Sequence, residues 1–140
     1  MTTPMYTSAR TMSVRYDGGE RYEIAVRDHA VAVDQPLEAG GSDTAPTPVE
    51  LFVASLAGCV AFYAGRYLTR HGLPRDGLAV TASYAMAPDP PARITDVRVT
   101  VRPPDALPAY RRPALRSVVE HCTIHNSLVV PPTVAIEFID

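Results

Sequence analysis

The chain of 140 residues has few cysteines, no concentration of charge and no long uninterrupted apolar run. Its 13 basic and 15 acidic residues give a formal net charge of −2 and form no block of one sign. This even distribution argues against a nucleic-acid partner bound through its phosphates. Two cysteines do not suggest a structural disulfide, so catalytic, redox and inert buried roles are all open for them.

Neither the N-terminal sequence nor the longest apolar segment resembles a targeting or membrane-spanning element. The start, Met-Thr-Thr-Pro-Met-Tyr, lacks the basic and apolar regions of a signal peptide. The apolar segment 49–64 is interrupted by Glu50 and Ser55 and is too short to span a bilayer. Together with an ordinary composition, these features predict a soluble, cytoplasmic protein of one domain, residues 1–140, without a membrane partner.

Three short strands are expected near the N-terminus. Apolar and polar residues alternate in them, and turn-forming sequences separate them. The expected strands are 11–16, 22–26 and 30–33, with turns at 17–19 and 27–29. A loop is expected at 35–46, with Gly40-Gly41 as its flexible point.

The best-specified element is a helix that begins at Thr47. Thr47 is a favourable N-cap, Pro48 suits the first helical position, and Glu50 completes a capping box three residues after the cap. Residues 51–62 are apolar on nearly every face, and Gly72 ends the helix. A helix that is apolar all round must be covered on every side. In so small a chain, a partner subunit is the natural source of that cover.

The second half of the chain predicts two long strands, a helix and a last strand. The ranges are 78–87 and 94–102 for the strands, 107–122 for the helix, with a kink or fresh start at Pro113, and 133–139 for the last strand. Alternation of Val97, Val99 and Val101 with polar residues indicates a half-buried strand. The order βββ-α-ββ-α-β predicts an α+β fold, not a doubly wound sheet.

The two cysteines each occupy a core helix, which suggests a buried dithiol and redox chemistry. Cys59 lies about twelve residues into its helix, so the helix N-terminus cannot activate it, and a cation from another segment must do so. The alternative is that Cys59 is a small core residue. Cys122, at the end of the second helix, has His121 and His125 nearby. A site made of Cys59, Cys122 and His125 would be a further alternative, a metal centre.

Glu50 has two candidate roles: the capping box, or an acid that orients a cation beside a thiolate. In a regular helix nine residues place it roughly 13 to 14 Å from Cys59 along the axis and about 180° around it. The two residues therefore cannot meet within one helix. If Glu50 serves a Cys59 site, it serves that of another subunit.

The chain contains two distinctive motifs. One is Pro46-Thr47-Pro48-Val49-Glu50-Leu51 followed by Ala57-Gly58-Cys59, and the other is Cys122-Thr123-Ile124-His125-Asn126-Ser127-Leu128. Together they resemble the motifs of the OsmC/Ohr family of thiol peroxidases. The resemblance covers nearly the whole chain and implies an OsmC-like fold with a long central apolar helix. It also implies an intertwined homodimer with active sites at the interface.

The resemblance further implies the chemistry. Cys59 would be the peroxidatic thiolate that reduces an organic hydroperoxide and becomes sulfenic acid, and Cys122 would resolve it as a disulfide. A dithiol such as a lipoylated protein would then reduce that disulfide, and no cofactor is needed. The cysteine activation would come from Glu50 paired with an arginine, for which Arg21 is the first choice, Arg27 the second and Arg15 the third.

The remaining expectations concern the substrate and a rival function. Phe52, Phe62 and Leu128 are expected to bind the organic part of the peroxide. Thr123 stands where the family commonly has proline. Because a fold does not determine a function, the alternative is a non-catalytic OsmC-like dimer that binds a ligand or senses redox state.

Overall fold

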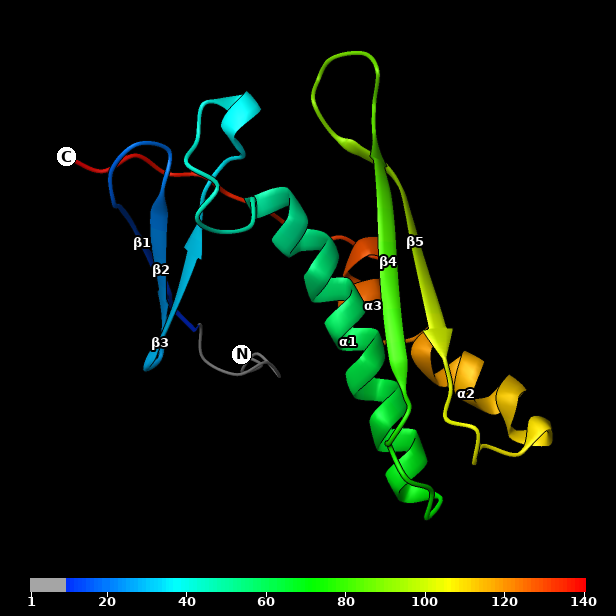
Figure 1. Cartoon of the computed structure of the whole chain (residues 1–140). Coiled ribbons are helices and arrows are strands. Elements are labelled where there is room, and N and C mark those ends of the chain that lie inside the picture. Colours follow the sequence, from blue (N-terminus) through cyan, green and yellow to red (C-terminus); the bar gives the residue numbers. More distant parts are fainter. Residues whose placement is uncertain (1–9) are drawn as a thin grey trace, which may run out of the picture. The chain divides into compact units, whose positions relative to one another are not determined.

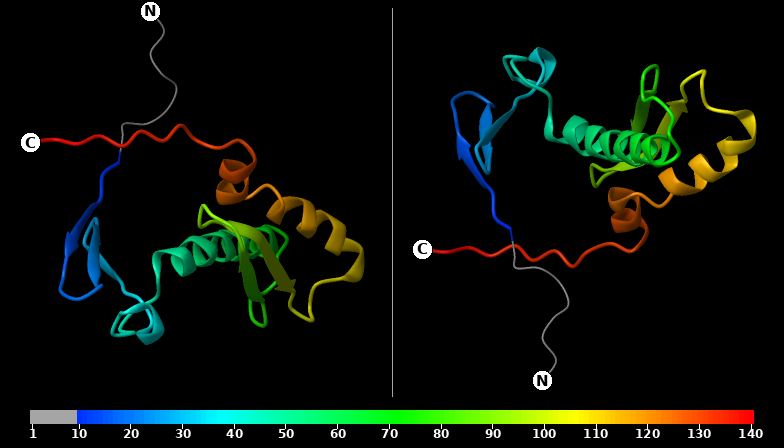
Figure 2. Two further views of the ribbon diagram at one scale, coloured as in Figure 1. Left: turned by 90° about the horizontal axis from the view of Figure 1, so that it is seen from above. Right: turned by 90° about the horizontal axis from the view of Figure 1, so that it is seen from below.

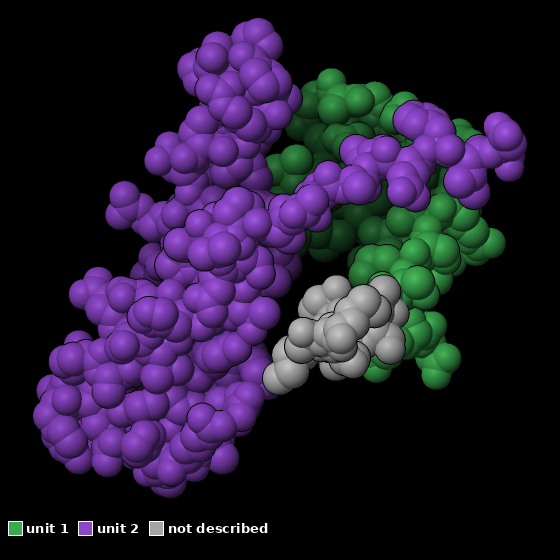
Figure 3. Space-filling view, turned by 180° about the vertical axis from the view of Figure 1, so that it is seen from behind, with its two compact units in different colours: residues 1–51 green, residues 52–140 purple. Residues whose placement is uncertain are grey.

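The computed structural model describes residues 10–140 (Figure 1). The chain divides into two compact units, residues 1–51 and residues 52–140 (Figure 3). Each unit is described by itself below. The single domain expected for residues 1–140 stays a prediction, whereas the α+β class is confirmed by the mixture of helices and antiparallel strands.

The first unit contains a three-stranded antiparallel sheet in the order β1-β2-β3. Its strands are β1 (Ser13–Tyr16), β2 (Tyr22–Val26) and β3 (His29–Val33), which confirms the three expected strands to within two residues. The turn between β1 and β2 contains Gly18 and Gly19 with φ angles of 92° and 53°. Such positive φ angles favour glycine, and so the turn is encoded locally.

The loop after β3 is held by a buried aspartate. Asp34 is 1% exposed. It accepts hydrogen bonds from the backbone N–H of Gln35 (2.7 Å) and from the N–H and Oγ1 of Thr44 (3.0 and 2.6 Å). A 3-10 turn, η1 (Leu37–Ala39), lies within the loop. A Cβ on Gly41 would collide with the carbonyl of Gln35, so this glycine permits a close backbone approach and is not a point of flexibility.

Helix α1 (Pro48–Arg70) begins with the predicted capping box. The backbone N–H of Thr47 donates to Glu50 Oε1 (2.8 Å), and the N–H of Glu50 donates to Thr47 Oγ1 (3.0 Å). After α1, Gly72 adopts a φ of 67°, as expected for a residue that ends a helix. Part of the apolar surface is uncovered: Phe52 is 43% and Phe62 is 52% exposed.

The length of α1 corrects one expectation. At 23 residues, it is long and apolar enough to cross a membrane by length and composition. The shorter apolar segment considered in the sequence did not reach this length. The core helix of a soluble protein passes the same test, so the property is weak evidence for a membrane location.

The second unit continues with a hairpin of β4 (Ala79–Met86) and β5 (Ile94–Arg102), which confirms the two long strands. Val97, Val99 and Val101 pack toward α1, whereas Arg98, Thr100 and Arg102 are exposed, as the alternation predicted. Figure 2 shows α1 and the hairpin lying side by side in two views. The hairpin thus supplies one wall around the middle of α1.

The second predicted helix is divided into three pieces. They are η2 (Ala109–Arg111), α2 (Arg112–Val119) and α3 (Thr123–Val129). Pro113 lies at the start of α2, as a fresh start requires. The expectation of one helix to residue 122 was wrong, because the chain leaves the helix after Val119 and Cys122 has extended backbone as the N-cap of α3.

The last predicted strand is not formed within the single chain. Residues 133–139 pair with no strand in the described part of the chain. Their large apolar side chains are almost fully exposed: Val134 77%, Ile136 84%, Phe138 97% and Ile139 92%. A strand needs a neighbour for its backbone hydrogen bonds. The segment therefore has the sequence of a strand and lacks a partner in this chain.

Two apolar clusters form the core of the second unit. One gathers around the C-terminal half of α1 and contains Ala64, Tyr67, Leu68, Leu107 and Leu115. The other gathers around the middle of α1 and contains Leu56, Val60 and Cys122. The second cluster brings the two cysteines together.

Candidate active site

The two cysteines belong to one apolar cluster in the second unit. Cys122 is fully buried against Leu56 and Val60 of α1, and Cys59 packs against the same cluster. Both are free thiols, and Cys59 is partly exposed. The dithiol expected from the sequence is therefore formed between two helices, with one thiol accessible and the other enclosed.

Burial raises the pKa of the Cys122 thiol. The backbone N–H groups of His125 and Ile124 act in the opposite direction on this pKa, while the neighbouring Cys59 side chain raises it further. The result is a thiol that stays protonated at neutral pH. Its contact with Cys59 is the contact that a disulfide between them would need.

Hydrogen bonds position the corner on which Cys122 lies. Tyr63 Oη of α1 and Thr123 Oγ1 of α3 are 2.7 Å apart. The Asn126 side chain donates to the carbonyl of His121 (3.1 Å), and His121 Nδ1 lies 2.7 Å from the carbonyl of Ser117. These contacts fasten the segment on both sides of Cys122, one of them directly to the helix that carries Cys59.

Sequence reasoning missed the Tyr63–Thr123 contact. The two residues are 60 positions apart, and no periodicity relates them. Only the spacing of Cys59 and Tyr63 could have indicated a role for Tyr63, because residues four apart on a helix lie one turn apart on the same face. Thr123 was noticeable in the sequence only because the OsmC/Ohr family commonly has proline at this position.

The expected substrate-binding residues lie on two helices. The spacing of Phe52, Cys59 and Phe62 places all three on one face of α1. Phe52 and Phe62 leave much of their rings exposed on the helix face that carries the accessible thiol. Leu128 lies in α3 and is 42% exposed, and it does not pack on the cluster that contains Cys122.

Glu50 and the candidate arginines belong to the first unit. Glu50 is engaged in the capping box. Arg21 donates from Nε to Asp17 Oδ2 (3.0 Å) and from a terminal nitrogen to Thr44 Oγ1 (2.7 Å). Since Thr44 Oγ1 in turn donates to Asp34, the guanidinium lies at the end of a chain of hydrogen bonds that starts at a buried carboxylate.

The other two arginines have simpler surroundings. Arg27 is exposed at the turn between β2 and β3, with a φ of 52°, and Arg15 forms a surface ion pair with Glu23 (2.9 Å). The three candidate arginines lie in the first unit and Cys59 lies in the second, so the contacts within each unit place none of the three beside Cys59. The activation of Cys59 therefore stays a prediction.

A buried carboxylate, Asp34, is linked to Arg21 through Thr44, and no sequence motif indicated it. Hydrogen bonds from the side chain and backbone of Thr44 and from the backbone of Gln35 lower the pKa of Asp34 to about 2, although burial opposes them. Asp34 thus remains charged throughout the ordinary pH range. It fixes the hydroxyl that holds Arg21.

The metal alternative finds no support. Among residues 10–140 there is no group of three or more His, Cys, Asp or Glu side chains that could hold a metal ion. A groove of ≈ 880 Å³ lies nearby between β5 and α2, and it reaches Leu56, Val60 and His125. Its size is within the range of organic-ligand sites, although neither cysteine lines it.

Comparison with solved structures supports the fold. A Psychrobacter arcticus 273-4 protein, described as an osmotic stress induced and detoxification response protein, has a TM-score of 0.77 at 21% identity, over 89% of this chain and 91% of that one. The organic hydroperoxide resistance protein OsmC of Legionella pneumophila has a TM-score of 0.65 at 19% identity, covering 90% and 91%.

A Vibrio cholerae protein described as an organic hydroperoxide resistance protein, with captopril bound in one of the active sites, has a TM-score of 0.64 at 21% identity, covering 92% and 89%. No curated protein sequence matches the chain. Residues 40–137, well over half of the chain, match the family described as OsmC-like protein. The chain therefore belongs to the OsmC-like family, whose structural relatives include organic hydroperoxide resistance proteins.

Proposed function

We propose that the protein is a thiol-dependent peroxidase that reduces organic hydroperoxides. The observation that supports it best is the pair of free thiols in one cluster, with Cys59 accessible and Cys122 buried. This difference in exposure suits two different roles. The accessible Cys59 thiol can react with a peroxide from solvent. The enclosed, neutral Cys122 thiol is shielded from the peroxide and can react with the sulfenic acid that forms beside it.

The proposed cycle has three balanced steps. The Cys59 thiolate attacks the terminal peroxide oxygen, which breaks the O–O bond and, with one proton, gives Cys59 sulfenic acid and an alcohol. The Cys122 thiol then attacks the sulfenic sulfur, and its proton leaves with the hydroxyl group as water while the Cys59–Cys122 disulfide forms. A dithiol reductant, such as a lipoylated protein, restores both thiols by exchange and is itself oxidised to a disulfide.

We assign the remaining roles to a homodimer in the cytoplasm. Glu50 lies nine residues from Cys59 on the same helix and on its opposite side, so its carboxylate would act on the Cys59 site of the second copy. There it would hold an arginine, Arg21 first and Arg27 second, against the thiolate and lower its pKa by charge proximity. Phe52, Phe62 and Leu128 would bind the organic part of the peroxide.

A second candidate function is a non-catalytic dimer that binds a ligand or senses redox state. It is favoured by one observation, that contacts within the second unit place no arginine beside Cys59. Two thiols without an activating cation would form a disulfide slowly and report the redox state without efficient turnover.

Stopped-flow measurement of peroxide consumption by the reduced protein separates the two functions. The peroxidase should consume cumene hydroperoxide much faster than hydrogen peroxide, with loss of two thiols per chain. Cys59→Ser should abolish consumption, whereas Cys122→Ser should allow one turnover and then stop at the sulfenic acid. A fully active Cys59→Ser variant, or two thiols that survive excess cumene hydroperoxide, would refute the peroxidase.

A further inference from the structure

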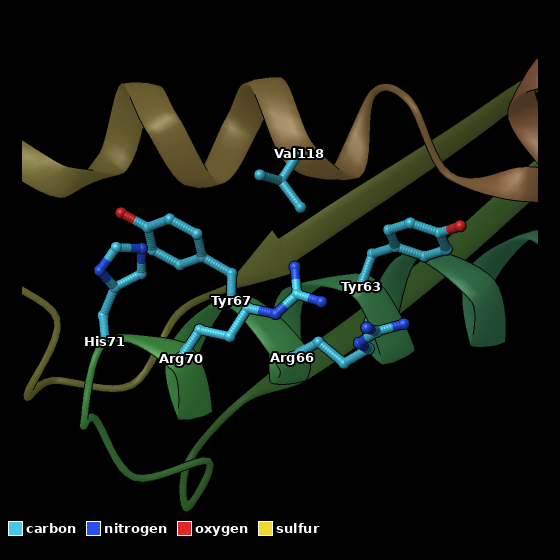
Figure 4. A pocket seen from close by; sticks show the side chains of 6 residues that line it. All are labelled: Tyr63, Arg66, Tyr67, Arg70, His71 and Val118. Atoms are coloured by element: carbon cyan, nitrogen blue, oxygen red, sulfur yellow. The ribbon is translucent and has the colours of Figure 1, made fainter.

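A pocket of ≈ 370 Å³ lies between α1 and α2, and neither cysteine lines it (Figure 4). It is lined by Tyr63, Arg66, Tyr67, Arg70, His71 and Val118. Val118 reaches into it from α2, and the other side chains come from the C-terminal half of α1 and the residue that follows it. The volume is near the lower end of the range for small organic ligands.

Two arginines of the pocket have no acidic partner. Arg66 and Arg70 form no ion pair and no hydrogen bond with any residue of the described part of the chain. They are one helical turn apart, and two like charges at this spacing destabilise a helix. Arg70 in the last turn is favourable for the helix dipole, and the Arg66 guanidinium lies 5.5 Å from the centroid of the Phe62 ring, but neither interaction neutralises a charge. An anion between the two guanidinium groups would relieve their repulsion.

The walls of the pocket are aromatic and fixed. The rings of Tyr67 and His71 are 4.3 Å apart, and His71 Nδ1 accepts a hydrogen bond from Arg111 (2.9 Å), because a guanidinium can only donate. Tyr67 belongs to the buried core. Figure 4 shows the Arg70 guanidinium between Tyr67 and Tyr63, pointing toward Val118. A ligand with an anionic end and an apolar body would match both features.

The pocket is aligned with the accessible thiol. Cys59, Tyr63, Arg66 and Arg70 follow one another at spacings of four, three and four residues, so they lie on one face of α1. Along the helix axis Arg66 and Arg70 are roughly 10 and 16 Å from Cys59. That span corresponds to about 8 to 13 bonds of an extended alkyl chain, at roughly 1.3 Å of advance for each 1.5 Å bond.

We propose that this pocket is a carboxylate-binding subsite. Arg66 and Arg70 bind the carboxylate of an amphiphilic ligand, whose alkyl chain lies against Tyr63 and Tyr67 and runs toward Cys59. That the ligand's alkyl chain points toward Cys59 rests on the proposed peroxidase function. Under that function, the preferred hydroperoxides carry a carboxylate. Binding of the carboxylate itself does not rest on that function.

Calorimetric titration of the Cys59→Ser full-length protein with octanoate and with 1-octanol tests the subsite. Octanoate should bind saturably, one per chain, and at least about tenfold more tightly than octanol. The double variant Arg66→Gln/Arg70→Gln should weaken octanoate binding at least about tenfold. Arg93→Gln, which removes an exposed arginine in the loop between β4 and β5, should leave it unchanged.

Three results would overturn the subsite. One is equal affinity for octanoate and octanol. Another is unchanged octanoate binding in a double variant that unfolds at the same urea concentration as its parent. The third is displacement of octanoate by an equal concentration of inorganic phosphate, since a site for any anion makes no use of the aromatic walls.

Kinetics with the reduced wild-type protein separates the subsite from the peroxidase. The double variant should lower kcat/KM for a carboxylate-bearing alkyl hydroperoxide about tenfold more than for neutral cumene hydroperoxide. Octanoate binding without consumption of either peroxide would refute the peroxidase and support the subsite. Consumption of cumene hydroperoxide without octanoate binding would refute the subsite alone.

Discussion

The hydrogen bond between Tyr63 and Thr123 should control how fast Cys122 resolves an oxidised Cys59. It joins α1, which carries Cys59, to the first residue of α3, directly after Cys122. A neutral side-chain hydrogen bond contributes about 1 kcal/mol net, which is a factor of about five in an equilibrium. Tyr63→Phe and Thr123→Val remove it and change little of the shape of either side chain. Each should slow disulfide formation about fivefold and leave sulfenic acid formation unchanged.

The assay is a stopped-flow reaction of the reduced protein with cumene hydroperoxide, in which dimedone traps the sulfenic acid. Each single variant should give more trapped protein, and the double variant should give no more than either single one, because both lose the same bond. Tyr84→Phe, which changes a half-exposed tyrosine of β4, is the matched control. Additive effects of the two changes, or unchanged trapping, would refute the reasoning. A urea double-mutant cycle measures the same coupling without any peroxide.

Four further predictions concern the ionisable groups and the helix cap. Because the pKa of Cys122 is raised above its ordinary value of 9.0, its protonated form stabilises the fold below pH 9.0, and this contribution is lost as the pH rises through the folded pKa. Urea unfolding at increasing alkaline pH should therefore show a steeper loss of stability in the wild type than in Cys122→Ala; parallel curves would contradict the burial argument. The pKa of Asp34 is lowered from 3.8 to about 2, so its contribution is present above pH 3.8 and lost toward pH 2, and Asp34→Asn should flatten acid unfolding followed by circular dichroism in that window. Thr47→Ala should cost about 1 kcal/mol of stability while Thr47→Ser costs little, as measured by urea unfolding. Glu50→Gln retains the capping box, so a variant that keeps its stability and loses peroxide consumption would show that the Glu50 charge serves the site.

Local chemistry explains why much of the fold could be predicted. The capping box of Thr47 and Glu50 is a contact between residues three apart, and the alternation in β5 depends only on which side of a strand each residue faces. Both are visible in the sequence, and both are present in the structure. The residues of the dithiol were also predictable, since cysteines are few.

The break before α3 and the last strand show where such reasoning stops. Helical spacing continues through Leu115, Val118, Val119 and Cys122. That spacing indicates that these residues face the core, but it does not determine whether the last of them is still in the helix. Cys122 is buried as an N-cap instead. Residues 133–139 alternate like a strand, yet pairing depends on a neighbour that local sequence does not specify. The contact of Tyr63 with Thr123 depends in the same way on how distant segments meet.

Packing and chemistry both point to a second copy of the chain. The exposed rings of Phe52 and Phe62 on α1 and the unpaired apolar segment 133–139 are surfaces that one chain leaves uncovered. Large exposed apolar surface of this kind marks an interface. The Glu50 of a second copy is free of the geometric restriction that keeps each Glu50 from the thiol on its own helix. We infer that the monomer would retain both thiols and lack their activation, so that peroxide consumption per chain should fall steeply with dilution below the dimer dissociation constant.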